Sequence, residues 1–287
     1  MLSAAKRLIP IQVKLKIRGY LSNRREARCR AKLFGELAPL VPPVERMFEG
    51  PQSLEEYRSN GEEFLKIYQE LCGLRPDEKM LDVGSGIGRK TLPLTQYFNE
   101  RAIYEGIDIK KSGVDWCRER ITSRFGNFHF QHIDVHNKHY NPEGRYQPSE
   151  YRFPFVDESF DFVMLGSVFT HMLPDDVKNY LSEVHRVLKS GGRCLITYFL
   201  LNGESLRLIK SGDTTLDFRY AFDKHRSISG DLPEQAIALD QRWISDLYEK
   251  LGLKIMRLDY GSWCAREKYL SYQDLVLAVK GRGDDLG

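Results

Sequence analysis

The chain has 287 residues and a formal net charge of +3, with 41% hydrophobic and 29% charged residues. This is the composition of an ordinary soluble globular protein, and the length is sufficient for one large domain with a substantial core. No apolar run approaches the roughly 18 residues of a transmembrane helix, and no repeat suggests a solenoid. The five scattered cysteines form no C-x-x-C pair. We therefore expect no metal site and no disulfide framework, and a reducing, cytoplasmic location.

Positive charge is concentrated at the N-terminus. Residues 1–34 contain ten Lys or Arg and one acid, a local charge of +9 that leaves −6 for the remainder. Apolar residues alternate with polar ones at four positions, which predicts a strand: Ile11, Val13, Leu15 and Ile17. We divide the chain into a basic arm and linker, 1–52, and a main domain, 53–287.

The basic arm suits three uses. It is a solvated appendage packed on the main domain, or it contacts anionic lipid at a membrane surface or targets an organelle, or it binds nucleic acid. A membrane surface or an organelle is thus the alternative location to the cytoplasm. The sequence gives no signal for an oligomeric state.

A helix is predicted to begin after the linker. Ser53 and Glu56 have the spacing of a capping box, and Gly73 is a typical helix stop. Gly61 lies in the middle of this segment and predicts a break there.

From residue 80 onward, strands alternate with helices. Seven short apolar runs predict strands at 80–83, 104–109, 128–133, 160–165, 194–201, 253–258 and 275–279. Helices are predicted at 114–124, at 177–188 with a stop at Gly191-Gly192, and at 240–251. Near-continuous apolar strands separated by helices indicate an α/β fold with a mostly parallel sheet covered on both faces. In such sheets, ligands bind at the carboxyl ends of the strands.

A glycine-rich loop follows the first strand and excludes two nucleotide-binding patterns. The phosphate-binding loop of NTPases requires G-x-x-x-x-G-K-[ST], and here Arg89 disrupts the spacing before Lys90. The dinucleotide fingerprint G-x-G-x-x-G requires a small residue where Arg89 stands. A dehydrogenase is therefore the last alternative.

The loop fits a third pattern, D-x-G-x-G-x-G, through Asp82, Gly84, Gly86 and Gly88. It resembles motif I of the class I S-adenosylmethionine-dependent methyltransferases, of the small-molecule type. The later segments are similar to this family's further motifs, in the same order: Asp108 at the end of the second strand, Ile133-Asp134-Val135, Ser159–Leu165 and the "RVLK-x-GG" run at 186–192. The resemblance covers residues 55–202.

The resemblance implies a Rossmann-like, doubly wound sheet of seven strands in the order 3-2-1-4-5-7-6, with the last strand antiparallel. It also implies S-adenosyl-L-methionine as the methyl donor. The cofactor-binding residues that it implies are Asp82, Gly84, Ser85, Gly86, Gly88, Asp108, Ile109, Asp134, Val135 and Ser167.

Each of these residues has an expected role. The glycine loop and Ser167 would contact the methionine part, and Asp82 would orient its ammonium through the loop backbone or water. Asp108 would accept the ribose hydroxyls, while Asp134 and Val135 would bind the adenine. Arg89 either pairs with the methionine carboxylate or caps the following helix.

His171 is the candidate general base, because it lies just beyond the fourth strand and histidine titrates near neutrality. Its alternative role is to bond the backbone or line the cofactor pocket. Tyr198 is a weaker candidate, and His185 is expected to be a surface or packing residue.

Two insertions, 136–155 and 203–232, follow the carboxyl ends of strands and are expected to cover the acceptor. Aromatic residues of the first include Tyr140, Tyr146, Tyr151 and Phe153. The second contains six basic or histidine residues: Arg207, Lys210, Arg219, Lys224, His225 and Arg226. Such side chains suit an anionic or sugar-like small molecule, although solvated surface loops would have the same composition.

The first interpretation is a methyltransferase acting on an O or N atom of a small metabolite. No [ND]-P-P-[YF] motif and no Pro-Cys pair is present, which argues against two kinds of nucleic-acid methylation. One alternative is methylation of RNA or protein docked by the basic arm. The other is a nucleotide-binding module without turnover.

Overall fold

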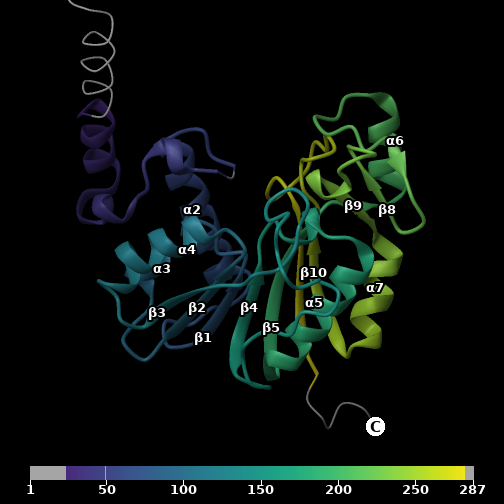
Figure 1. Ribbon diagram of the computed structural model, residues 1–287. Helices are drawn as coiled ribbons and strands as arrows, with labels where there is room; N and C mark the ends of the chain where they lie inside the picture. The colour runs from purple at the N-terminus through teal and green to yellow at the C-terminus, as the bar shows by residue number, and fades with distance from the viewer. Residues whose placement is uncertain (1–23, 49, 282–287) are drawn as a thin grey trace, which may run out of the picture.

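A seven-stranded sheet forms the centre of the molecule in the computed structural model, which describes residues 24–48 and 50–281 (Figure 1). Its strands lie in the order β10 (Leu253–Asp259), β11 (Asp274–Lys280), β5 (Leu188–Tyr198), β4 (Phe160–Leu165), β1 (Lys79–Val83), β2 (Ile103–Asp108) and β3 (Phe128–His132). Strand β11 pairs antiparallel with both β5 and β10, and the other pairs are parallel. This confirms the predicted order and the single antiparallel strand.

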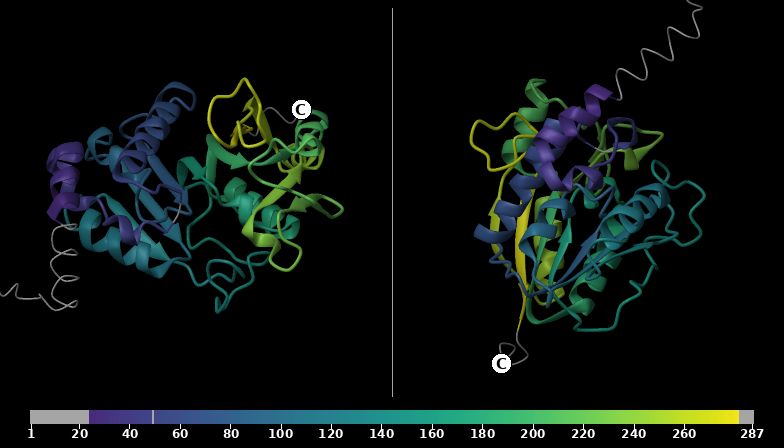
Figure 2. Two further views of the ribbon diagram at one scale, coloured as in Figure 1. Left: turned by 90° about the horizontal axis from the view of Figure 1, so that it is seen from above. Right: turned by 90° about the vertical axis from the view of Figure 1, so that its left-hand side faces the viewer.

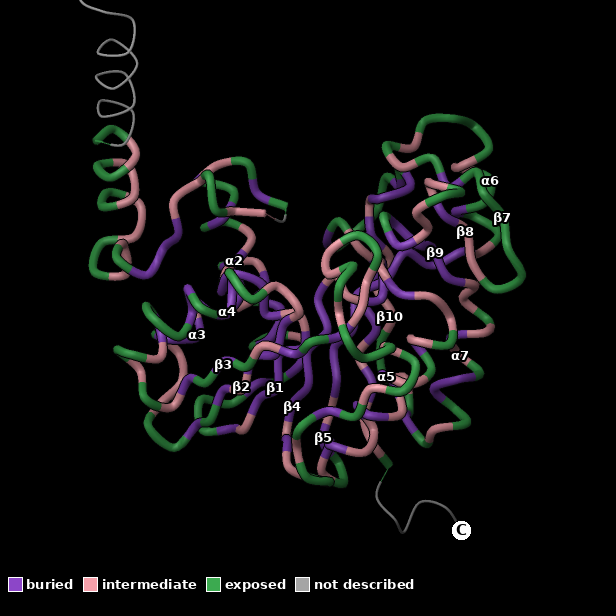
Figure 3. The backbone as a smooth tube through the Cα atoms, in the orientation of Figure 1, coloured by how far each residue is buried: buried purple, intermediate pink, exposed green. Residues whose placement is uncertain are grey.

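Helices cover both faces of this sheet, as expected. One face packs against α2 (Leu54–Glu70), α3 (Thr91–Tyr97) and α4 (Lys111–Cys117), and the other against α5 (Pro174–Val187) and α7 (Gln241–Lys250). Along β4, the side chains of Phe162 and Met164 pack in the core on the α2 face of the sheet, whereas those of Val163 and Leu165 pack in the core on the α5 face. Because successive residues of a strand point to opposite faces, a sheet buried on both sides requires continuous apolar runs. Figure 3 shows these buried strands at the centre.

Helix α2 is continuous, so the break predicted at Gly61 is wrong. A Cβ at this position would lie 2.8 Å from the main-chain oxygen of Arg89, so Gly61 permits close packing rather than a kink. The predicted cap is present, since the Ser53 hydroxyl accepts from the N–H of Glu56. The Glu56 carboxylate accepts from Gln52, one residue before the expected partner.

Two helix ends differ from the prediction. Helix α5 ends at Val187 and β5 begins at the next residue, so Gly191-Gly192 lie within the strand instead of stopping the helix. A Cβ on Gly192 would lie 2.8 Å from the Lys189 oxygen, which explains a glycine at this irregular strand start. The helix predicted at 114–124 is α4 followed by a π-helical turn, Arg118–Thr122.

The second insertion is an ordered unit of its own. It contains α6 (Gly203–Ser211), β7 (Tyr220–Ala221) and β8 (His225–Ser227). The two strands join β6 (Leu200–Leu201) and β9 (Ile237–Asp240) in a small sheet, ordered β6-β9-β8-β7. A separate apolar cluster that includes Phe218 and Trp263 lies beneath it. Figure 2 shows this unit on the side of the molecule opposite the N-terminal helix.

The described part of the N-terminal arm packs on the main domain. Residues 24–34 are helical, and a 3₁₀ turn, Gly35–Leu40, follows. Leu40 and Val41 are buried in the same core as α2, and the Trp116 indole donates to the Leu40 oxygen at 3.2 Å. The alternation at residues 11–17 lies outside the described residues. Within the described residues, no helix has the length and apolar character needed to span a bilayer.

Candidate active site

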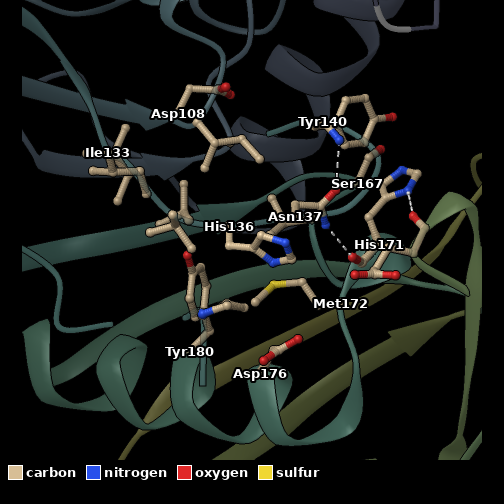
Figure 4. Close-up of a pocket in the computed structure, with 18 of the residues that line it drawn as sticks. Asp108, Ile133, His136, Asn137, Tyr140, Ser167, His171, Met172, Asp176 and Tyr180 are labelled. Carbon is tan, nitrogen blue, oxygen red and sulfur yellow. Dashed lines mark hydrogen bonds between the residues drawn. The ribbon is translucent and has the colours of Figure 1, made fainter. Parts of the chain in front are cut away.

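A cavity of about 260 Å³ lies at the carboxyl ends of the central strands. Its walls come from the glycine loop, the ends of β2 and β3, and residues 136–148 of the first insertion (Figure 4). Residues 166–173, which follow β4, and the start of α5 complete it. This is the edge of the sheet where the topology predicts a ligand site.

The glycine loop lets other groups come close to its backbone. Gly84, Gly86 and Gly88 all have positive φ, a conformation that glycine adopts without strain. A Cβ on Gly84 would lie 2.5 Å from Val168, and one on Gly88 would lie 2.9 Å from Ile121. Gly84 lines the cavity, so a ligand there would meet backbone atoms directly.

Asp108 is buried at the end of β2 and lines the cavity (Figure 4). One carboxylate oxygen accepts from the N–H of Gly86 at 2.7 Å, and the other from the N–H of Lys110 at 2.6 Å. These bonds hold the carboxylate in place at the cavity wall. A carboxylate held in this place suits the two vicinal hydroxyls of a ribose, which is the role expected for Asp108.

Apolar side chains form the wall beside Asp108. Asp134, which was expected to bind the adenine, does not contribute to this wall. Ile109, Ile133 and Val135 line the cavity. Asp134 is exposed and lies outside the cavity lining, although its main-chain oxygen accepts from the N–H of Tyr146. The apolar wall suits a flat aromatic base, whereas the structure does not bring Asp134 into the cavity.

Asp82 lies behind the glycine loop. It is buried and accepts from the Tyr104 hydroxyl at 2.6 Å. Burial raises the pKa of this carboxyl, and the nearby positive charge of Lys90 opposes the rise. Asp82 does not line the cavity, which leaves it only the indirect role expected through the loop backbone.

A second, smaller pocket of about 20 Å³ lies on the outer side of the glycine loop. Ser85 and Gly86 line it together with Arg89 and Lys90. Two cations beside backbone amides suit a carboxylate, which is the first of the two roles expected for Arg89.

Ser167 follows β4 with a φ of +64°, a strained value for a residue with a side chain. Its N–H donates to the Thr197 hydroxyl at 2.7 Å, and its own hydroxyl donates to the Gln273 amide oxygen at 3.0 Å. Contacts from β5 and from the residue before β11 thus hold this turn at the cavity wall.

His171 ends a 3₁₀ turn, Phe169–His171, and lines the cavity (Figure 4). Its Nδ1 lies 2.9 Å from the main-chain oxygen of Glu234. Because a carbonyl only accepts, Nδ1 carries the hydrogen and Nε2 keeps its lone pair. Burial lowers the pKa of the imidazole, and the bond to Glu234 partly offsets that effect. His171 is therefore a neutral imidazole of fixed tautomer near pH 7.

Two residues of the first insertion hold His171 in place, of which the sequence had singled out Tyr140 but not Asn137. The Asn137 amide donates to the His171 main-chain oxygen at 3.0 Å, and the Tyr140 ring stands perpendicular to the imidazole at 5.0 Å. Asn137 and Tyr140 lie in the first insertion, and Glu234 lies just beyond the second. The only available signal was the position of the insertions after the strand ends.

Two other residues are excluded from the chemistry by their places in the fold. Tyr198 is fully buried and shares a hydrogen bond with the Tyr248 hydroxyl at 2.8 Å, so it is a core residue. His185 is half-buried on α5 and outside the cavity lining.

The expected basic cover is not formed. None of the six basic or histidine side chains singled out in 203–232 lines the cavity, and among described residues the sole Lys or Arg of its lining is the exposed Lys138. Of the aromatic residues named in 136–155, Tyr140 alone lines it. The basic residues named for an anionic acceptor therefore do not face the site.

Comparisons with known proteins agree with this geometry. Residues 81–196, from β1 to β5, match the family described as methyltransferase domain. The ubiquinone/menaquinone biosynthesis C-methyltransferase of Wigglesworthia glossinidia brevipalpis is 30% identical over 124 residues, 43% of this chain and 44% of that protein. The arsenite methyltransferase of Mus musculus is 30% identical over 147 residues, 50% of this chain and 37% of that protein.

The chain thus spans less than half the length of these two curated relatives, and their names differ in the atom that is methylated. Among solved structures, magnesium protoporphyrin IX methyltransferase from Synechocystis PCC 6803 superposes with a TM-score of 0.52 at 16% identity. That match covers 93% of this chain and all of the other, and it shows a shared fold. Residues 81–196 thus match the methyltransferase-domain family, and the seven-stranded fold that contains them is shared with a known methyltransferase.

Proposed function

We propose that the protein transfers a methyl group from S-adenosyl-L-methionine to an oxygen or nitrogen atom of a small polar metabolite. The observation that carries the cofactor assignment is Asp108, fixed at the cavity wall between the N–H groups of Gly86 and Lys110. The apolar wall with Ile109 and Val135 beside it fits an adenine, and the small pocket with Arg89 fits a carboxylate.

When bound, the cofactor supplies a sulfonium methyl, which is already an electrophile. The residues of this chain have three tasks: to orient the acceptor, to exclude water and to take up a proton where a hydroxyl reacts. His171 has the required protonation state for the last task, because its Nδ1–H is committed to Glu234. Residues 136–148 cover the cavity and limit access by water.

A small acceptor is supported by this cover. Hydrogen bonds hold the first insertion at several points. The Lys110 ammonium donates to the main-chain oxygen of Tyr140, and the Asn179 amide donates to the main-chain oxygens of Pro148 and Tyr151. A tethered cover over a cavity of about 260 Å³ suits a metabolite better than a folded RNA or protein.

The cofactor assignment is tested by thermal unfolding with S-adenosylhomocysteine, with NAD and ATP as controls. At about 100 times the dissociation constant, a bound ligand stabilises the fold by roughly 2.7 kcal/mol, which is a shift of several degrees. We expect the shift with S-adenosylhomocysteine alone. Asp108→Ala should weaken its binding about 10- to 100-fold, since hydrogen bonds to a charged group contribute about 1.5–3 kcal/mol. The matched control is Asp115→Ala, at an exposed position on α4.

The acceptor class is tested with a tritiated methyl donor and a cell extract separated by size. We expect label to appear in the small-molecule fraction. Label in RNA or protein would contradict a metabolite acceptor, and a shift with NAD but not S-adenosylhomocysteine would contradict the cofactor assignment.

A further inference from the structure

Two carboxyl groups, Asp176 and Glu234, line the same cavity away from the ribose-binding Asp108. Figure 4 shows Asp176 at the opposite end of the site from Asp108, below His136 and Met172. Asp176 lies in the first turn of α5. Glu234 belongs to a 3₁₀ turn, Pro233–Gln235, that follows the second insertion. Neither residue was singled out by the sequence.

Glu234 is 94% buried, yet its Oε2 atom is sealed from solvent without a hydrogen-bond partner among the described residues. The main-chain oxygen of Glu234 already accepts a hydrogen bond from His171. The question of a partner therefore concerns the side chain. An ionised carboxylate in such surroundings is costly unless an opposite charge or a hydrogen-bond donor meets it.

Asp176 adds a second negative charge to this end of the cavity. Burial raises the pKa of its carboxyl to about 6, against the stabilising N–H of Leu173, and the Glu234 charge adds to the rise. Neither acid forms an ion pair with a described Lys or Arg. Among described residues, the imidazole and cationic groups of the cavity lining are His136, His171 and the exposed Lys138, and the neighbouring Asp175 carries a further negative charge that raises the pKa of Asp176.

We propose that Glu234 and Asp176 bind a protonated amino group of the methyl acceptor, so that the acceptor is an amino compound rather than an anion. This rests on the proposed function and narrows its substrate class. A bound ammonium supplies three hydrogen-bond donors and a positive charge, which relieves the repulsion between the two acids and offers a partner to the buried Glu234 carboxyl group. An anionic acceptor would add a third negative charge beside them.

The test uses three two-carbon probes that differ in the charge of one end: 2-aminoethanol, ethylene glycol and glycolate. Each is added to the full chain saturated with S-adenosylhomocysteine, and binding is followed by ligand-observed NMR. We expect binding in the order 2-aminoethanol, ethylene glycol, glycolate. Glu234→Gln, and separately Asp176→Asn, should weaken 2-aminoethanol at least tenfold. Asp175→Asn, at the exposed neighbouring position, should leave it unchanged.

The affinity for S-adenosylhomocysteine is measured first, by calorimetry, on the wild type and each variant. If the wild type fails to bind it, the proposed function is wrong and the narrower proposal falls with it. If it binds but glycolate matches 2-aminoethanol, or Glu234→Gln leaves 2-aminoethanol unchanged, only the amino-compound proposal is overturned. An equal loss of S-adenosylhomocysteine affinity in Glu234→Gln would also overturn it, because the carboxylate would then serve the cofactor.

Discussion

The imidazole of His171 donates to the main-chain oxygen of Glu234 at 2.9 Å, which joins the turn after β4 to the unit built by the second insertion. This single bond sets the tautomer of the candidate base. It also brings the Glu234 side chain to the wall of the same cavity. The orientation of the base therefore depends on a segment 63 residues away in the sequence.

His171→Ala should lower the rate of methylation of a hydroxyl acceptor by roughly 10²- to 10⁴-fold, the usual contribution of a general base. The affinity for S-adenosylhomocysteine should stay within twofold, because His171 is at the acceptor side of the site. Steady-state kinetics and calorimetry on the same preparation measure the two effects. Unchanged turnover would reduce His171 to a packing residue.

The pH dependence of kcat/KM should show an acidic limb below pH 6.5. Burial lowers the pKa of His171 from its ordinary value of 6.5, so the neutral, basic form persists to more acidic pH than in free histidine. Activity is retained above the lowered pKa and is lost as pH falls through it. A profile measured with His171→Gln should lose the part of this limb that His171 causes, while Asp176, with a pKa of about 6, still contributes to it. An inflection above pH 6.5 in the wild type would contradict the assignment.

Asp176→Asn should stabilise the protein at pH 7.5 and leave it unchanged near pH 3.5. The pKa of Asp176 is raised to about 6, so between pH 3.8 and 6 the folded state holds a proton that the unfolded state has released. The free energy of unfolding then falls as pH rises through this window. Because the group is partly exposed, the gain should be about 1 kcal/mol rather than the full value of the shift. Urea unfolding at both pH values measures it, and equal gains at both would exclude a titration effect.

Asp274→Ala should destabilise the fold by about 3–5 kcal/mol, because it leaves three buried N–H donors unpaired and Arg266 with Glu204 as its remaining carboxylate. The Asp274 carboxylate accepts from the N–H groups of Gly261 and Leu200 at 2.7 Å and from the Trp263 indole at 2.8 Å, and it pairs with buried Arg266. Urea unfolding at pH 7.5 is the measurement. The exposed pair of Asp217 and Arg219 supplies the control, since Asp217→Ala should cost less than about 1 kcal/mol.

The sheet was predictable because its signals are local. Apolar runs buried on both faces mark the strands, and the glycines at 84, 86 and 88 mark the loop where backbone must approach a ligand. The error at Gly61 arose because packing against Arg89, 28 residues away, decides that position. Propensity alone contains no information about such a neighbour.

The acceptor side of the site was less predictable for the same physical reason. Asn137, Tyr140 and Glu234 come together only because two insertions fold over one edge of the sheet. The charged composition of 203–232 pointed to a basic cover, yet these side chains lie outside the cavity lining because the segment folds into its own small sheet. Composition predicts how many charges a segment has, and not the direction in which they point.

The small sheet has a consequence for the proposed methyl transfer. The groups placed for nucleotide binding, Asp108 and the glycine loop, belong to the central sheet, whereas the partner that fixes the base follows β8 and precedes β9. Opening of the small sheet alone would release the imidazole and leave the nucleotide site intact. Such protein would still bind the cofactor but would not transfer the methyl group. The fraction of protein molecules that bind the cofactor would then exceed the fraction that are catalytically active.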